Sequence, residues 1–285
     1  MEMMEPETER GKKIRAFLRN KTSIVGLGLI VVITLIAVFA SYIAPYDVRA
    51  QNLAERLLKP GWPHLLGTDD FGRDNLSRAI LGTRISLAVG VISVLISVFL
   101  GMMVGMIAGY FGGKFDVLVV GIVDILMAFP TILLSLTLLF ILGPGLSTLI
   151  IAIAFSFFPR FIRIARASTL SVKEEKYIEG ARLVGRGDWG ILIFHILPNI
   201  SGPIIVIGTL WVATAIRIEA SLSFLGFGVN PPTPTWGNMI RSGVTFLQIN
   251  PWLVVVPGLA IMVTVIAFNM LGDGIRDISD PRLRG

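Results

Sequence analysis

The chain has 285 residues, of which 54% are hydrophobic and only 15% are charged, and it contains no cysteine. A chain this apolar cannot bury its hydrophobic side chains in one soluble core, so the composition predicts a polytopic membrane protein. The lack of cysteine excludes disulfides, thiolate metal sites and cysteine catalysis, and the net charge of +6 does not indicate nucleic-acid binding because the basic residues flank apolar segments.

Six apolar segments are long enough to cross a bilayer, which requires about 20 helical residues. They lie near residues 24–44, 85–109, 115–140, 146–165, 200–221 and 252–271. The first follows a basic stretch, as the core of a signal peptide would, but it is too long for such a core and is interpreted as a membrane anchor. The predicted fold is all-α, with six transmembrane helices.

The distribution of lysine and arginine predicts the orientation of these spans, because basic residues collect on the cytoplasmic side. Most of the 25 basic residues lie near the two termini, at Lys114 and after the fourth span, so we expect both termini in the cytoplasm. The expected segments are a cytoplasmic tail at 1–23, a first span at 24–44, an extracytoplasmic segment at 45–84, a five-helix core at 85–271 that includes a cytoplasmic loop at 166–199, and a cytoplasmic tail at 272–285.

The extracytoplasmic segment 45–84 is too polar to be buried in lipid. Within it, Thr68-Asp69-Asp70 has the pattern of a helix N-cap followed by acidic residues in the first turn. Asp69, Asp70 and Asp74 could also be read as calcium ligands, but the loop spacing of an EF-hand is absent. The helix cap is the favoured interpretation, and no metal site is predicted.

Small and charged residues in the second and third spans predict how these helices pack. Gly101, Gly105 and Gly109 recur every fourth residue and would form a ridge that permits close helix crossing. Asp124 lies within the third span, where an ionised carboxylate is costly unless it is paired, and Pro130 predicts a kink. Asp124 either lines a substrate path and receives a cationic amino group or has a structural partner on a neighbouring helix or subunit, and the structural role is favoured.

Three arginines end the fourth span. Arg160, Arg163 and Arg166 are spaced three apart, so they lie along one face of the helix. Anchoring at the lipid headgroups is the favoured interpretation, and contact with a partner is the alternative.

The loop 166–199 is more elaborate than a simple connection. Ser171 and Glu174 have the spacing of a capping box that would begin a helix, and Gly185 would end it. Asp188 suits the N-cap of a following turn, and Pro198 suits the first turn of the fifth span. Such a loop could transmit a movement from the cytosol into the membrane, and an ordinary connection lying on the membrane surface is the alternative.

The outer end of the fifth span and the loop after it carry polar and aromatic residues. Arg217 and Glu219 point in nearly opposite directions on a helix, so each needs another partner. Interface anchoring is favoured there over a gate contact. The run Pro231-Pro232-Thr233-Pro234 predicts an extended loop, and Trp236 is placed where an interfacial aromatic would lie.

Part of this loop pattern matches a known family. Glu179-Gly180-Ala181, then Gly185 and finally Leu197-Pro198 resemble the EAA motif of bacterial ABC-importer permeases, with Gly180 in place of the first Ala and His195 where Ile is common. Passages at 66–84, 219–240 and 269–285 resemble the C-type subunit of the dipeptide/oligopeptide/nickel branch. The likeness runs from about residue 17 to the end of the chain.

The resemblance implies a type I ABC importer permease in a prokaryotic inner membrane. It implies a coupling helix that docks into an ATPase subunit, and the motif residues that would make this contact are Glu179, Gly180, Ala181, Gly185, Leu197 and Pro198. It also implies contact with an extracytoplasmic solute-binding protein, for which the candidates are Asp69, Asp70, Arg73 and Trp236. The expected partners are a homologous permease subunit in a heterodimer, two ABC ATPase subunits, the binding protein and membrane lipid.

No catalytic residue and no cofactor are expected in this chain, because it lacks the GxxxxGK[ST] phosphate loop and ATP with Mg²⁺ would be bound by the ATPase subunits. Peptides are the expected substrate class, while nickel, glutathione or oligosaccharides could be imported by the same architecture. An ion-coupled secondary transporter is the rival from another class. Such proteins usually carry several intramembrane ionisable groups or broken helices, and only Asp124 meets that description here.

Overall fold

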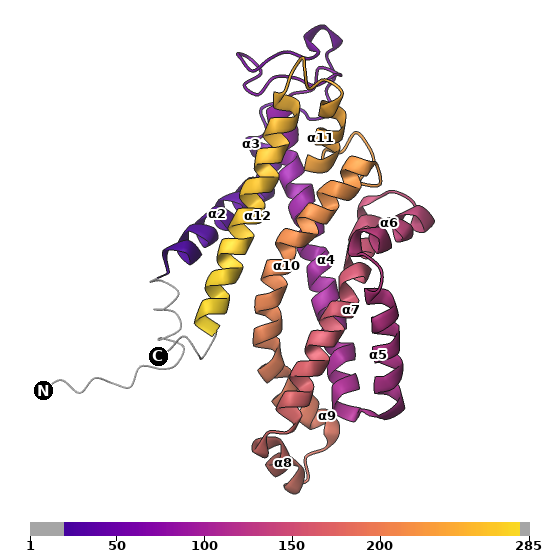
Figure 1. The fold of residues 1–285 in the computed structure, drawn as a ribbon. Coiled ribbons are helices and arrows are strands. Elements are labelled where there is room, and N and C mark those ends of the chain that lie inside the picture. The colour runs from indigo at the N-terminus through magenta and orange to yellow at the C-terminus, as the bar shows by residue number, and fades with distance from the viewer. Residues whose placement is uncertain (1–19, 280–285) are drawn as a thin grey trace, which may run out of the picture.

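A computed structural model describes residues 20–279. In this range, long helices run side by side, with loops gathered at one end of the bundle and a short protruding helix at the other (Figure 1). Residues 1–19 of the predicted N-terminal tail and residues 280–285 of the predicted C-terminal tail lie outside the described range. In chain order the helices are α2 Lys21–Val38, α3 Ala40–Ile43, η1 Leu53–Glu55, α4 Asn75–Phe111, α5 Gly113–Met127, α6 Thr131–Leu142, α7 Leu146–Lys173, α8 Lys176–Leu183, α9 Asp188–Ile191, η2 Leu192–Ile196, α10 Leu197–Leu225, α11 Trp236–Val244 and α12 Trp252–Ser279.

The described residues contain five helical segments long and apolar enough to cross a membrane, and a sixth if α5 and α6 are taken together. These two helices meet at an angle of 92°. The break falls at Pro130, which cannot donate a backbone hydrogen bond and confirms the predicted kink. The predicted span at 115–140 is therefore present as a broken pair of helices, with a bend much sharper than a simple kink.

The centre of the bundle is the packing of α4 against α7. A Cβ atom at Gly105 would lie 2.3 Å from the carbonyl oxygen of Ile162, and one at Gly101 would lie 2.6 Å from the Cβ of Phe161. Gly109 approaches α7 in the same way, so the predicted glycine ridge is confirmed. Because the two backbones nearly touch, α4 and α7 form a rigid axis that the other helices surround.

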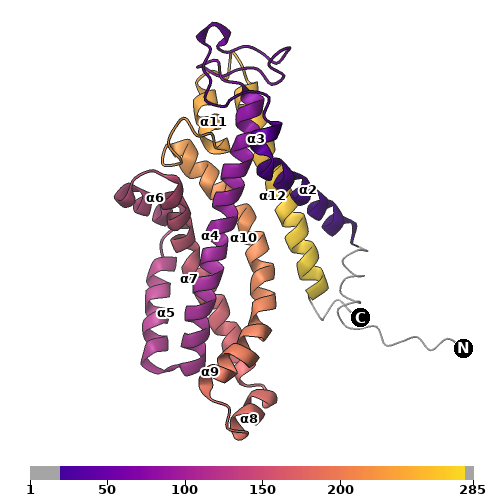
Figure 2. The same cartoon turned by 180° about the vertical axis from the view of Figure 1, so that it is seen from behind.

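The first span lies at the edge of this bundle. Helix α2 crosses α12 obliquely, as both side views show (Figures 1 and 2). Gly26 makes the crossing close, because a Cβ atom there would lie 2.8 Å from the backbone nitrogen of Leu271. The N-terminal span therefore packs most closely on the last helix and also contacts α4.

Helix α4 begins well before the predicted span 85–109 and takes in the end of the predicted segment 45–84. Its N-cap is Asp74, whose Oδ2 accepts a hydrogen bond of 2.7 Å from the backbone nitrogen of Ser77. The predicted helix N-cap at Thr68-Asp69-Asp70 is therefore wrong. These residues instead belong to a loop in which Thr68 pairs with Asp74 in an isolated bridge.

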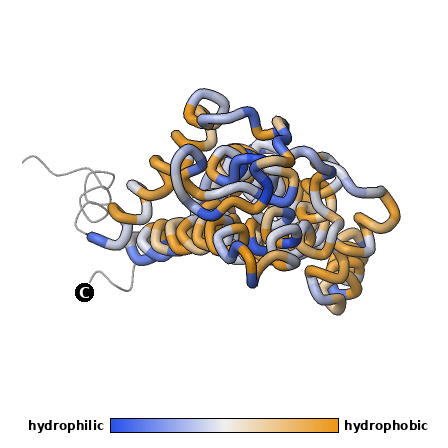
Figure 3. The backbone as a smooth tube through the Cα atoms, turned by 90° about the horizontal axis from the view of Figure 1, so that it is seen from above, coloured by the Kyte–Doolittle hydropathy of each residue, from blue (hydrophilic) through white to orange (hydrophobic). Residues whose placement is uncertain are grey.

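Residues 44–74, between α3 and α4, form the larger part of the end opposite α8, and we call them the cap. Seen from above, its loops alternate between hydrophilic and hydrophobic colours, whereas the helices beneath are mainly hydrophobic (Figure 3). Helix α11, which the sequence patterns did not predict, lies beside the cap (Figure 1). It follows residues 231–234, which form a turn and not the predicted extended run.

Candidate coupling and translocation sites

Helix α8 extends beyond the ends of the long helices (Figures 1 and 2). Helix α7 continues to Lys173, so Ser171 and Glu174 do not begin α8 and the predicted capping box is wrong. The N-cap of α8 is Glu175. Gly185 has a φ of +82° just after the helix, a conformation in which glycine has no Cβ penalty, and this confirms the predicted end.

The two sides of α8 have different surroundings. Ile178 is fully buried and Ala181 packs against the same hydrophobic core, so this side attaches the helix to the bundle. On the other side Glu179 is exposed, and the side chains of Leu183 and Val184 are 83% and 89% exposed. Large apolar side chains at the tip of a polar, projecting loop are typical of a surface that a partner covers.

Gly180 does not distort this helix. A Cβ atom at this position would meet no other atom within 4 Å, so the alanine that the EAA motif usually has would fit without rearrangement. Glycine at this position therefore makes the helical conformation of α8 about 1 kcal/mol less stable than alanine would. No packing contact requires the glycine.

A polar cluster joins the α8 region to the end of α4. The hydroxyl of Tyr110 donates a 2.7 Å hydrogen bond to Oδ1 of Asp188, and the ammonium of Lys173 donates to the carbonyl of Tyr110 at 2.5 Å. The guanidinium of Arg182 lies 5.4 Å from the centre of the Tyr110 ring. Asp188 is thus a partner of Tyr110 and not the predicted N-cap, which is Gly187.

The path from this loop into the membrane is one continuous helical run from Asp188 to Leu225. Pro198 lies in the first turn of α10, as predicted, and the residues before it, Leu192–Ile196, form a π-helix. Pro198 has no N–H and its ring crowds the carbonyl four residues earlier, so a wider turn before it relieves both problems. Sequence reasoning missed this π-turn, although the proline within a helical run was its signal.

The three arginines of α7 each contact a side chain of a neighbouring helix. Arg166 forms a bidentate pair with Asp116, with Nη2 2.6 Å from Oδ2, and Arg163 forms an ion pair with Asp124. Arg160 lies over the ring of Trp211, 4.5 Å from its centre. These partners lie within the chain, and anchoring at the lipid headgroups stays a prediction for the exposed side chains of Arg160 and Arg163.

Asp124 has a structural partner on a neighbouring helix, as favoured. Both it and Arg163 keep more than half of their side-chain surface exposed in the isolated chain, 57% and 52% respectively. Contact of Asp124 with substrate stays a prediction.

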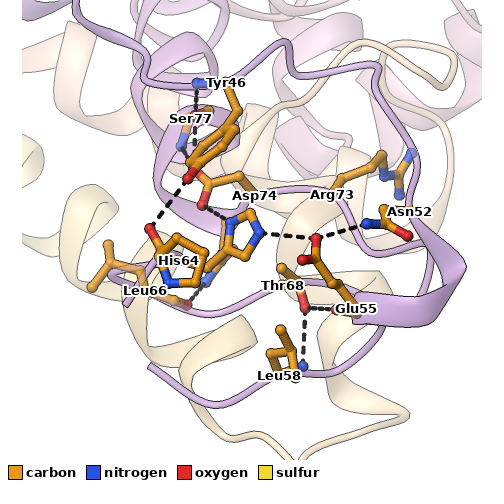
Figure 4. Close-up of polar contacts among 12 residues, drawn as sticks. Tyr46, Asn52, Glu55, Leu58, His64, Leu66, Thr68, Arg73, Asp74 and Ser77 are labelled. Carbon is orange, nitrogen blue, oxygen red and sulfur yellow. Dashed lines mark hydrogen bonds and ion pairs between the residues drawn. The ribbon is translucent and has the colours of Figure 1, made fainter. Parts of the chain in front are cut away.

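In the cap, His64 joins residues that are distant in sequence (Figure 4). Its Nδ1 lies 2.8 Å from Oδ1 of Asp74, and its Nε2 lies 3.3 Å from Oε2 of Glu55. Burial alone would lower the pKa of His64, but the hydrogen bonds and negative charges of Asp74 and Glu55 raise it overall. An imidazolium can donate from both nitrogens, so the protonated form fits this site. No sequence pattern had singled out His64.

The candidate binding-protein contacts are mostly inaccessible. Asp69 and Arg73 are buried and form a 2.7 Å ion pair with each other. Trp236 is only 1% exposed, and its Nε1 donates to the carbonyl of Ala79 at 3.2 Å, so the expectation of an interfacial aromatic is wrong. Asp70 alone of the four retains partial exposure, and burial, together with the charge of Asp69, raises its pKa.

Arg217 and Glu219 do not pair with each other, as predicted. Glu219 is fully buried and accepts a 2.7 Å hydrogen bond from the hydroxyl of Ser223. Arg217 is exposed and donates to the hydroxyl of Thr214 at 3.1 Å. Interface anchoring is therefore wrong for Glu219, which lies buried among neighbouring helices instead.

The comparisons with known proteins agree with this geometry. Residues 101–285 match the model for binding-protein-dependent transport system inner membrane components, and residues 12–60 match the model for the N-terminal transmembrane domain of oligopeptide transport permease C. The dipeptide transport system permease protein of Escherichia coli K12 is 46% identical over 94% of this chain and 91% of its own length. The glutathione transport system permease protein of Shigella flexneri is 44% identical over 95% of this chain and 90% of its own length.

The chain therefore belongs to the family of binding-protein-dependent transport system inner membrane components. Within that family it is a C-type permease subunit of an ATP-driven ABC importer, a multi-pass protein of the bacterial inner membrane. The EAA motif of the family falls on α8 and the run that follows it.

Proposed function

We propose that the chain forms half of a translocation path for short peptides. In this proposal it pairs with a homologous permease chain, two ABC ATPases bind below, and an extracytoplasmic solute-binding protein delivers the peptide. The observation that carries the proposal is α8, a projecting helix with the exposed apolar residues Leu183 and Val184 beside Glu179 of the motif. ATP and Mg²⁺ would be bound by the ATPases, and the chain itself would hold no cofactor and no catalytic residue.

Peptides are the best supported substrate class. The relatives named above transport a dipeptide and glutathione, and both molecules carry peptide bonds and free carboxylates. A nickel ion and a neutral oligosaccharide share neither feature.

Two routes would carry the movement of the ATPases into the membrane. Closure of the ATPases would push on α8, and the hydrogen bond between Tyr110 and Asp188 would pass the displacement to α4. The continuous helical run that begins at Asp188 would pass it to α10. Together they would change the bundle from inward-facing to outward-facing.

The same proposal fixes the orientation. The α8 end would lie in the cytoplasm, and the cap would lie outside, where the binding protein docks. Both termini would then be cytoplasmic, as the distribution of basic residues indicates.

Co-purification tests the proposal directly. Leu183→Asp places a charge in the proposed ATPase contact and should reduce the ATPase that co-purifies with the permease by at least about tenfold, since burying an unpaired carboxylate costs several kcal/mol and each 1.4 kcal/mol is about a factor of ten. Leu53→Asp is the matched control, because Leu53 is 66% exposed in the cap at the opposite end and should leave ATPase binding unchanged. The proposal fails if no ATPase associates with the native chain and Glu179→Ala leaves uptake intact.

An ion-coupled secondary transporter is the competing function. Its coupling would require a titratable group that is free to exchange an ion within the membrane. Asp116 and Asp124 are already held by arginines of α7, and a third carboxyl, Glu219, is fully buried against Ser223, which favours the importer.

A further inference from the structure

The arginines of α7 are not equivalent. Arg166 and Arg163 are each neutralised by a carboxylate of α5, but Arg160, one turn further along, has no carboxylate partner among the described residues. The reason is the break at Pro130: α5 ends at Met127, so its row of carboxylates stops before it reaches Arg160. An unpaired guanidinium within a membrane-spanning segment is costly and is a sign of function.

A cavity of about 340 Å³ lies where Arg160 meets this break. Its walls come from the end of α5, the start of α6, and facing positions of α7 and α10. The residues that line it include Phe129, Thr131, Ser156, Arg160 and Trp211. The volume is in the range of sites that hold small organic molecules, about 300–1,000 Å³.

The chemistry of this cavity suits a carboxylate. The ring of Trp211 holds the guanidinium by a cation–π contact but uses none of its N–H donors, which stay available to a ligand. Helix α6 begins at Thr131 with no side-chain cap, so its first backbone N–H groups add a second source of positive potential at the same place. A planar guanidinium binds a carboxylate through two parallel hydrogen bonds.

We infer that this cavity is a transit site for the C-terminal carboxylate of the translocated peptide, with Arg160 as the group that binds it. The inference rests on the proposed function of peptide import. It adds a chemical requirement that import alone does not impose: a peptide without a free carboxylate would not be held at the α5–α6 break.

The absence of cysteine provides a clean probe of this site. Ser156→Cys places the only thiol of this chain in the cavity wall, and the complex is assembled with cysteine-free partner subunits in nanodiscs of phosphatidylcholine without anionic lipid. The reaction rates of a negatively charged and a neutral methanethiosulfonate reagent are then compared. A positive cavity should raise the rate for the anion by about tenfold relative to the neutral reagent, and Arg160→Gln should abolish the difference.

Protection during turnover identifies the ligand. With ATP and the binding protein present, a transported dipeptide should slow the modification of the thiol introduced by Ser156→Cys. The same dipeptide should fail to protect this thiol when Arg160→Gln is added. The double variant Arg163→Gln with Asp124→Asn is the matched control, because it removes a neighbouring guanidinium together with its counter-charge, and it should leave the preference for the anionic reagent in place.

Three results would overturn the inference: equal rates for both reagents with Arg160 present, protection by peptide that persists in Arg160→Gln, or modification that peptide never slows. The last is expected if an acidic residue of the companion permease covers Arg160. ATP-dependent uptake, measured after the same complexes are reconstituted into liposomes, distinguishes failure of the carboxylate site from failure of the proposed function. Intact uptake without a carboxylate site would refute the inference and leave the proposed function standing.

Discussion

At the residue scale, His64 connects the folding of the cap to pH. Its two ring nitrogens contact Asp74 and Glu55, and the ring packs against Tyr46 with centroids 4.7 Å apart. Because Asp74 is also the N-cap of α4, the state of His64 affects the point where the cap joins the first long helix of the core. Sequence patterns could not reveal these contacts, since His64, Glu55 and Asp74 meet only after the loop has folded.

We predict that the cap loses protection as pH rises. The pKa of His64 is raised in the folded protein, so its stabilising contribution is complete below about 6.5, the value of the unfolded chain, and is lost as the pH passes the higher folded-state pKa. The protection factors of the Thr68 and Asn75 amides, which are exchange rates corrected for the intrinsic effect of pH, should fall by about tenfold across this range. His64→Gln should make these protection factors independent of pH in this range, and an equal fall in both proteins would contradict the role given to His64.

The ion pair between Asp124 and Arg163 is a second residue-scale test. Asp124→Asn leaves Arg163 without a counter-charge in the membrane, at a cost of up to about 3 kcal/mol, and should lower the amount of assembled protein. The exchange Asp124→Arg with Arg163→Asp should restore it, as judged by size-exclusion chromatography in detergent. Normal assembly and transport by the single variant would remove Asp124 from both the structural and the translocation roles.

At the element scale, the features set by local spacing were predictable. The glycine ridge of α4 and the break at Pro130 follow from residue type and position, and both are present. The bounds of α7 and helix α11 were missed because tertiary packing decides where these helices stop, whereas the π-turn at Leu192–Ile196 was missed although Pro198 is a local signal for it. Two of the candidate binding-protein contacts, Asp69 and Arg73, are buried because the polar loops of the cap fold so that these side chains pair with each other.

Alanine at the glycine ridge tests the close approach of α4 and α7. Gly105→Ala should destabilise the protein by about 1–3 kcal/mol, because its methyl group would lie 2.3 Å from the carbonyl oxygen of Ile162. Gly121→Ala in α5 is the control, since a Cβ atom there meets nothing within 4 Å and alanine favours the helix. Thermal unfolding in detergent distinguishes them, and equal melting temperatures would contradict the packing described for the ridge.

At the scale of the whole molecule, the chain has two ends with different chemistry. One end exposes Leu183 and Val184 on α8, and the other buries the pairs of His64 with Asp74 and of Asp69 with Arg73, while the remaining charged side chains of the cap are mostly exposed. Between them, α5 leaves large apolar side chains such as Val117 and Ile125 exposed, 72% and 65% respectively, which suits lipid or a second permease subunit. The family and the helix that carries its EAA motif could be predicted from sequence, whereas the cavity beside Arg160 required the fold.

The most direct test of ATP-driven peptide import is uptake into liposomes that contain the chain with its companion permease and ATPases. Accumulation of a labelled dipeptide should require ATP and the binding protein, should fall to background with Leu183→Asp, and should be unaffected by ionophores that collapse proton and sodium gradients. Uptake by the chain without ATPases, driven by an ion gradient and abolished by those ionophores, would contradict this mechanism.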